Sequence, residues 1–334
     1  MLLCSASWIF NNMSSKLKKL QRRIFARLEW LPIALGFLIV PGLPRAGVLW
    51  LARAMGRIGA VCDRRGRSYA VANIDLVFPR HSAKRKRMIL HGCYRNIARV
   101  LLDMFWFGRN SAARVRRWTS LSPAWKHYLE LPGAKVIVTA HHGNWEMAAH
   151  VVVTSGHPLM SVGKPLGTVA TTRRLNAFRR RLGQEIVLAE GAVLPLLRTL
   201  KKGRNIALLA DQQLGPDEGG VWTDFLGTQA LTAPTPAFFA QRVKGAVIGV
   251  AYLQARPDGS YRCVGPAIVP QVEGETLEAL TQRITDASAA FIRRFPTQWL
   301  FAYKRWCDVP PGADPSRYPF YARPVRPPRH PPQG

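Results

Sequence analysis

Acidic residues are scarce in this sequence, and its cysteines form no pattern. Only 19 Asp and Glu residues face 48 Lys and Arg residues, which leaves a formal net charge of +29 at pH 7. The five cysteines are odd in number and scattered, without a C-x-x-C pair, so neither a disulfide framework nor a zinc site is predicted. This cysteine usage fits a reducing compartment that faces the cytosol.

The N-terminal region lacks a clear membrane span. Residues 1–10 are apolar but have no basic start and no cleavage pattern, so no signal peptide is predicted. Residues 30–44 carry no charge, yet they are fewer than the roughly 20 residues that a span needs and are broken by three prolines. Because basic residues flank this stretch on both sides, we expect residues 1–60 to be a basic region with a membrane anchor, either interfacial, re-entrant or spanning. A proline-broken core helix of a soluble protein is the alternative.

The large positive charge favours polyanionic partners: nucleic acid, an anionic membrane surface or an acidic protein. The sequence has no aromatic RNA-binding signature, helix-turn-helix or zinc-finger spacing. Charge alone does not choose among these partners, so the choice depends on the chemistry of the central part of the chain.

The central stretch, residues 135–150 (KVIVTAHHGNWEMAAH), predicts a catalytic turn. Its β-branched run reads as a buried strand, and Gly143 and Asn144 open a segment with helical spacing, so His141 falls on the strand-to-helix turn, where catalytic side chains lie in α/β sheets. Glu146 follows in the first helical turn, from which its carboxylate can reach the imidazole ring. The pair then reads as a general base and its orienting acid. The plainer alternative is a hydrogen-bonded histidine at a strand end.

The rest of the chain predicts one α/β catalytic domain, residues 61–310, followed by a proline-rich, basic and disordered tail, residues 311–334. Apolar runs and turn signals predict further strands over residues 158–162 and 205–210 and a hairpin over residues 246–268. Helical spacing predicts helices over residues 82–107, 191–202 and 276–295, with Ser82 as an N-cap. Residues 215–234 are glycine-rich and are predicted to be a loop.

The string His-His-Gly-Asn-Trp-Glu resembles the His-four-residues-acid motif of the glycerolipid acyltransferase superfamily, and most closely that of the lipid A secondary acyltransferases. AVANIDLVFPR and PTQWLFAYKRWCD resemble two further segments of that family, before and after the motif. The resemblance implies a mixed sheet flanked by helices, to which the composition adds an N-terminal helical membrane anchor. It implies that His141 is the general base and Glu146 its acid, with no metal and no cofactor.

The same resemblance implies a reaction and its partners. The acyl chain passes from an acyl carrier protein thioester to a hydroxyl of a lipid A precursor, at the cytoplasmic side of the cell inner membrane. The implied substrate-binding residues are Asn144, Lys164, Arg180, Asp211, Gln212 and Arg305. Arg179 or Arg181 remains open in place of Arg180, and Lys164 with this arginine run is the expected meeting point for the acidic carrier protein. His142 is given no catalytic role.

Two alternatives remain at this stage. One keeps the chemistry but takes another glycolipid or phospholipid acceptor, with acyl-CoA as donor. The other is a basic nucleic-acid-binding protein with a coincidental motif, which predicts a steep salt dependence of nucleic-acid affinity that His141→Ala leaves unchanged. The apolar residues of the 215–234 loop, namely Val221, Trp222, Phe225 and Leu226, are expected to line the acyl-chain groove.

Overall fold

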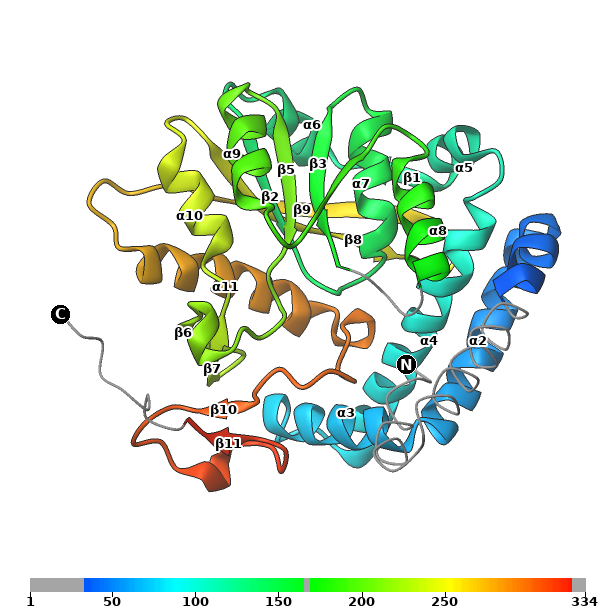
Figure 1. Ribbon diagram of the computed structural model, residues 1–334. Helices are drawn as coiled ribbons and strands as arrows, with labels where there is room; N and C mark the ends of the chain where they lie inside the picture. Colours follow the sequence, from blue (N-terminus) through cyan, green and yellow to red (C-terminus); the bar gives the residue numbers. More distant parts are fainter. Residues whose placement is uncertain (1–32, 165–168, 326–334) are drawn as a thin grey trace, which may run out of the picture.

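A mixed β-sheet forms the centre of the molecule. The computed structural model describes residues 33–164 and 169–325. In this part of the chain a seven-stranded sheet has the order β1-β9-β8-β2-β5-β3-β4, and helices cover both of its faces (Figure 1). All neighbours are parallel except the β8–β9 hairpin. The strands are β1 (Thr119–Leu121), β2 (Lys135–Thr139), β3 (Leu159–Gly163), β4 (Glu185–Leu188), β5 (Asn205–Leu209), β8 (Val247–Ala255) and β9 (Tyr261–Val269).

The central strand β2 is buried on both sides, as its uninterrupted β-branched run predicts. Successive side chains of a strand point to opposite faces. Val136 and Val138 therefore pack into a core with α9, α10 and α11, whereas Ile137 packs into a second core with α4, α6 and α7. The helices are α4 (Ala83–Trp106), α5 (Ser111–Trp118), α6 (Pro123–Glu130), α7 (Trp145–Thr154), α8 (Val169–Arg180), α9 (Val193–Lys201), α10 (Thr235–Arg242) and α11 (Leu277–Arg294).

The α/β fold with a mixed sheet flanked by helices is thus confirmed, and so are most of the predicted elements. Ser82 caps α4 by accepting a hydrogen bond from the backbone N–H of Arg85. The predicted 215–234 loop is wrong in its middle part, which forms a second small sheet, the hairpin of β6 (Val221–Phe225) and β7 (Thr228–Thr232). Phe225 and Leu226 are buried in a third core cluster beneath this hairpin.

The N-terminal part of the described chain lies against α4. Residues 33–39 are helical, and α2 (Arg45–Cys62) and α3 (Arg64–Val77) follow. None of the helices in the described ranges combines the length and the apolarity that crossing a bilayer requires. The predicted anchor lies partly in residues 1–32, outside the described residues, and its expected boundary at residue 60 falls inside α2.

The C-terminal segment is folded where the structure describes it. Strand β10 (Asp308–Val309) pairs with β11 (Arg323–Pro324), and a 3-10 turn spans Pro315–Arg317. The hydroxyl of Tyr321, a buried residue, donates to Oδ1 of Asn73 in α3 at 2.5 Å. The prediction of a disordered tail is therefore wrong for residues 311–325, because an aromatic anchor outweighs the proline-rich composition; residues 326–334 lie outside the described residues.

Candidate active site

The carboxyl ends of β2 and β5 bring His141 and Asp211 together. The two strands are parallel neighbours, and Thr139 of β2 pairs with Leu209 of β5. His141 and Asp211 each follow that pair by two residues, so the sheet register places them side by side at the edge where α/β folds bind ligands.

The Asp211 carboxylate holds the histidine ring in one orientation. Nδ1 of His141 lies 2.9 Å from Oδ1 of Asp211, and Oδ2 accepts from the His141 backbone N–H at 2.8 Å and from Nε1 of Trp299 at 2.8 Å. The His141 side chain is 15% exposed and that of Asp211 only 4%. A carboxylate on Nδ1 fixes the tautomer that leaves Nε2 as a proton acceptor. Nε2 lies 3.5 Å from the amide nitrogen of Gln212.

Opposing effects set the protonation of this pair. Burial alone would lower the pKa of His141, but the charge and hydrogen bond of Asp211, helped by the charge of Glu146, raise it above its ordinary value. Burial would raise the pKa of Asp211, but His141 and the hydrogen bonds from Trp299 and the backbone lower it. The aspartate is therefore a carboxylate at neutral pH, and His141 is a stronger base than a free imidazole.

Glu146 lies in the first turn of α7, as expected, but its carboxylate binds Arg179 and not the histidine ring. Nε of Arg179 donates to Oε2 at 2.9 Å and Nη2 to Oε1 at 2.7 Å, an arrangement with both side chains at most 15% exposed. The prediction that Glu146 orients the ring is corrected, because Asp211 already occupies Nδ1. Glu146 acts on His141 through its charge alone.

The arginine that reaches the site is Arg179 and not Arg180. Arg180 turns toward the carbonyl oxygen of Ile186, at 3.3 Å from its Nη2, and Arg181 donates to the carbonyl of Gly108. Successive residues of a helix point about 100° apart, so only one member of the run can face Glu146. Lys164 is exposed directly after β3, at the same edge of the sheet.

Asn144 and Arg305 are buried and serve the fold around the site. Asn144 caps α7, with its Oδ1 accepting from the N–H of Met147 at 3.1 Å. Arg305 is 0% exposed and donates to the Leu231 carbonyl at 2.6 Å and to the Thr232 hydroxyl, while burial lowers its pKa to about 10. Neither side chain is accessible to a substrate in this conformation.

His142, the neighbour of the candidate base, is buried and packs on Tyr252. The two rings stack with centroids 4.1 Å apart, and Nε2 of His142 lies 2.9 Å from the carbonyl oxygen of Phe295. Burial lowers its pKa to about 4, so this ring is neutral at physiological pH.

The site offers an imidazole whose Nε2 can accept a proton, a carboxylate that orients the ring, and a neighbouring carboxylate–guanidinium pair. Such a set can take a proton from a hydroxyl group and stabilise the charge that follows. Sequence reasoning placed Asp211 at the site but missed its contact with His141. The equal offset of two residues after neighbouring strands is the signal that would have found it.

Comparison with known proteins finds similarity to acyltransferases. Residues 14–308 match the family described as bacterial lipid A biosynthesis acyltransferase. The lipid A biosynthesis palmitoleoyltransferase of Escherichia coli (strain K12) is 24% identical over 301 residues, which cover 85% of this chain and 92% of the relative. The phosphatidylinositol mannoside acyltransferase of Mycolicibacterium smegmatis is 28% identical over 177 residues, covering 51% of this chain and 56% of the relative.

Proposed function

The chain belongs to the bacterial lipid A biosynthesis acyltransferase family and is an acyltransferase, and we propose that it moves a fatty acyl chain from an acyl carrier protein thioester to a hydroxyl of a lipid A precursor, with His141 as the general base. The observation that carries the proposal is the bond between Nδ1 of His141 and Asp211, which leaves Nε2, beside the Gln212 amide, as the proton-accepting nitrogen at the carboxyl edge of the sheet. The family membership favours this proposal over the nucleic-acid alternative.

In the proposed mechanism, Nε2 of His141 accepts the proton of the acceptor hydroxyl as its oxygen attacks the thioester carbonyl carbon. Asp211 stabilises the resulting imidazolium, and the charge of Glu146 adds to this effect. The tetrahedral intermediate collapses, the C–S bond breaks, and the leaving thiolate takes the proton back from His141. The histidine serves as a base throughout and forms no covalent bond to the acyl group.

The oxyanion of the intermediate needs hydrogen-bond donors. The Gln212 amide is close to Nε2 of His141, and the backbone N–H groups at the start of α7 belong to a helix N-terminus, which favours negative charge. Arg180, an implied substrate-binding residue, is not assigned this role because it donates to the carbonyl oxygen of Ile186. We assign the stabilisation to Gln212 and the helix N-terminus, with Arg179 holding Glu146 beside them.

The acidic carrier protein is the proposed donor because a net charge of +29 attracts acidic partners. Lys164 and Arg181 remain candidates for this contact, whereas Arg179 is occupied by Glu146. The likeness to mannoside acyltransferases supports a second acceptor, another glycolipid.

Purified enzyme incubated with acyl carrier protein and CoA thioesters of the same chain, and with an under-acylated lipid A precursor or a phosphatidylinositol mannoside, would separate these proposals. Mass spectrometry of the lipid products should show one added acyl group on the lipid A precursor, with the carrier protein thioester as the better donor. If only the mannoside were acylated, the proposed lipid A acceptor would be wrong. If the CoA thioester were the better donor, the proposed carrier-protein donor would be wrong.

Replacing Arg179 by alanine is expected to lower turnover by about 10- to 100-fold, because the mostly buried carboxylate of Glu146 loses its bidentate guanidinium partner. Arg180→Ala is the matched control: it removes an adjacent arginine whose hydrogen bond, among the described residues, goes to a backbone carbonyl. Steady-state kinetics on both variants tests the assignment. A loss of turnover in Arg180→Ala with normal turnover in Arg179→Ala would return the role to Arg180.

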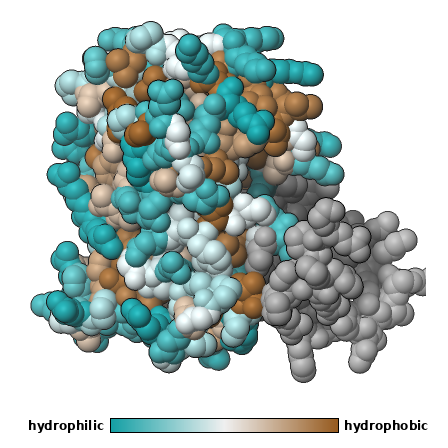
Figure 2. All heavy atoms as spheres, turned by 90° about the vertical axis from the view of Figure 1, so that its left-hand side faces the viewer, coloured by the Kyte–Doolittle hydropathy of each residue, from teal (hydrophilic) through white to brown (hydrophobic). Residues whose placement is uncertain are grey.

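Membrane attachment on the cytoplasmic side of the inner membrane is the proposed location, and the outer face of α2 supports it. Trp50, Ile58 and Val61 are 67%, 62% and 65% exposed, and at 100° per residue they share one side of the helix with the exposed Arg53 and Arg57. Apolar and basic side chains on one helix face suit an anionic lipid surface. On the side of α10 and α11, by contrast, hydrophilic residues predominate and hydrophobic ones form small groups (Figure 2).

A triple substitution of Trp50, Ile58 and Val61 by serine is expected to weaken binding to phosphatidylglycerol-containing vesicles by at least about tenfold, since each buried apolar side chain contributes about 1.5–3 kcal/mol when fully desolvated. Val193→Ser with Leu194→Ser on α9 is the control, because these residues are also exposed. Vesicle co-sedimentation measures both. Equal binding by the triple variant and the wild type would show that the membrane contact does not lie on α2. Deletion of residues 1–48 is a less suitable test of membrane binding, because it would also remove Val48, which is buried in the core.

A further inference from the structure

The turn that carries His141 is held in place by backbone groups from distant segments. The N–H of Gly143 donates to the carbonyl of Gln298 at 3.0 Å, and the N–H of Asn144 donates to that of Leu253 at 2.9 Å. Gly143 has φ of 63°, and a Cβ there would lie 2.0 Å from the Leu253 oxygen, so only glycine fits. The turn therefore has a fixed shape, set by what surrounds it.

Helix α4 reaches this turn twice from one face. Nδ2 of Asn96 donates to the carbonyl oxygens of Gly143 at 2.8 Å and Gln298 at 3.0 Å. Two helical turns further on, Oδ2 of Asp103 accepts from Nδ2 of Asn144 at 3.0 Å. Residues seven apart on a helix lie on the same side, so both contacts come from a single rigid element.

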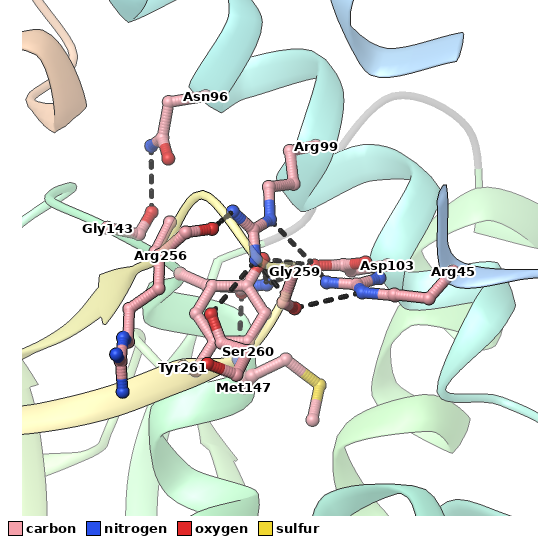
Figure 3. Close-up of polar contacts among 12 residues, drawn as sticks. Arg45, Asn96, Arg99, Asp103, Gly143, Met147, Arg256, Gly259, Ser260 and Tyr261 are labelled. Atoms are coloured by element: carbon pink, nitrogen blue, oxygen red, sulfur yellow. Dashed lines mark hydrogen bonds and ion pairs between the residues drawn. The ribbon is translucent and has the colours of Figure 1, made fainter. Parts of the chain in front are cut away.

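Asp103 is itself held by a buried network (Figure 3). Its side chain is 0% exposed; both Nη atoms of Arg45 and the hydroxyl of Tyr261 donate to it. Nε of Arg99 lies 3.9 Å from Oδ2, and Arg99 also donates to the carbonyls of Arg256, Gly259 and Ser260 in the β8–β9 hairpin. The carboxylate that meets Asn144 is thus fixed from several directions, without contact with His141 or with the proposed reacting groups.

From these contacts we propose that Asn96 and Asp103 are positioning residues for acyl transfer. Asn144 caps α7 through Oδ1 while its Nδ2 is tied to Asp103, so the direction in which α7 starts is set by α4. Glu146 lies in that first helical turn, and His141 precedes it on the turn that Asn96 holds. The proposal rests on the proposed function, because it concerns the placement of that base and its neighbouring carboxylate.

Reaction rates are sensitive to such placement, since a shift of about 1 Å can cost about 10²-fold. Asn96→Ala is expected to lower kcat at least about tenfold, with the KM for each substrate changed less than about twofold. The matched control is Asn205→Ala at the amino end of β5: Asn205 is also buried, and it too makes two hydrogen bonds with the backbone, to the Lys135 N–H and the Pro158 carbonyl, both at 3.1 Å. The control should lower Tm about as much while leaving kcat unchanged well below Tm.

Asn144→Asp supplies a second variant. The new carboxylate keeps an oxygen that can accept from the Met147 N–H at the start of α7. It replaces the Nδ2 donor with a second oxygen that repels Asp103, so kcat should again fall while KM stays the same. Asp103→Ala is avoided because it leaves the buried Arg45 without its counter-ion. Should Asn96→Ala not fold, Asn144→Asp carries the test.

Wild-type kcat in these variants, or equal losses of kcat in Asn96→Ala and Asn205→Ala, would overturn the positioning role. The proposed function fails on a different result, near-normal transfer by His141→Ala. The two failures can therefore be told apart in one set of measurements.

Discussion

Replacing His141 by alanine is expected to abolish acyl transfer and to leave the fold intact. The variant loses the proton acceptor, and general-base catalysis is usually worth about 10²–10⁴ in rate. The fold should persist because Asp211 keeps its hydrogen bonds from Trp299 and from the backbone N–H of residue 141. The measurement is kcat/KM from mass-spectrometric product formation, beside Tm from circular dichroism.

His157→Ala is the control for this experiment, because His157 is a partly exposed histidine just after α7, away from the base. It should retain wild-type transfer. Near-normal transfer by His141→Ala, with the control also active, would show that the proton is taken by another group.

Asp211→Asn is expected to lower turnover by about 10²–10⁴-fold with little change in fold, because an amide of the same shape no longer stabilises the imidazolium. The pH profile should change as well. In the wild type, activity is lost as the pH falls through the raised pKa of His141, since the base becomes protonated. Without the aspartate charge that pKa falls, so the residual activity of the variant should persist to lower pH.

The control is Glu185→Gln, which removes a carboxylate that pairs with Arg204 at the start of β4, where both side chains are more than a third exposed. Neither its turnover nor its pH profile should move. If the profile of Asp211→Asn matched that of the wild type, the titrating group would be something other than the His141 ring.

The sequence predicted half of the candidate site, and the reason lies in distance along the chain. The β-branched run of β2 and the glycine after it placed His141 on a turn, because both signals are local. Its partner follows β5, and only the pairing of Thr139 with Leu209 makes the two meet. Reasoning within one motif therefore chose Glu146, the nearest acid in sequence, over Asp211.

The arginine of the site was ambiguous for a different reason. Arg179 and Arg180 end α8 and Arg181 follows it, so the three side chains point in different directions, and the rotation of α8 against the sheet decides that Arg179 meets Glu146. That rotation follows from tertiary packing, which composition and periodicity do not encode. The C-terminal segment shows the same limit, since Tyr321 finds its partner in α3.

The turn around Gly143, which Asn96 of α4 holds, has a consequence for how the protein folds. Its contacts join residues far apart in the chain: 70 positions separate His141 from Asp211, 88 separate Asp211 from Trp299, and 202 separate Asn96 from Gln298. Non-local contacts form late and slowly in folding. A growing chain on the ribosome therefore cannot close its catalytic turn until the residues around Trp299 have emerged, and amide hydrogens of the turn should exchange only when much of the domain opens.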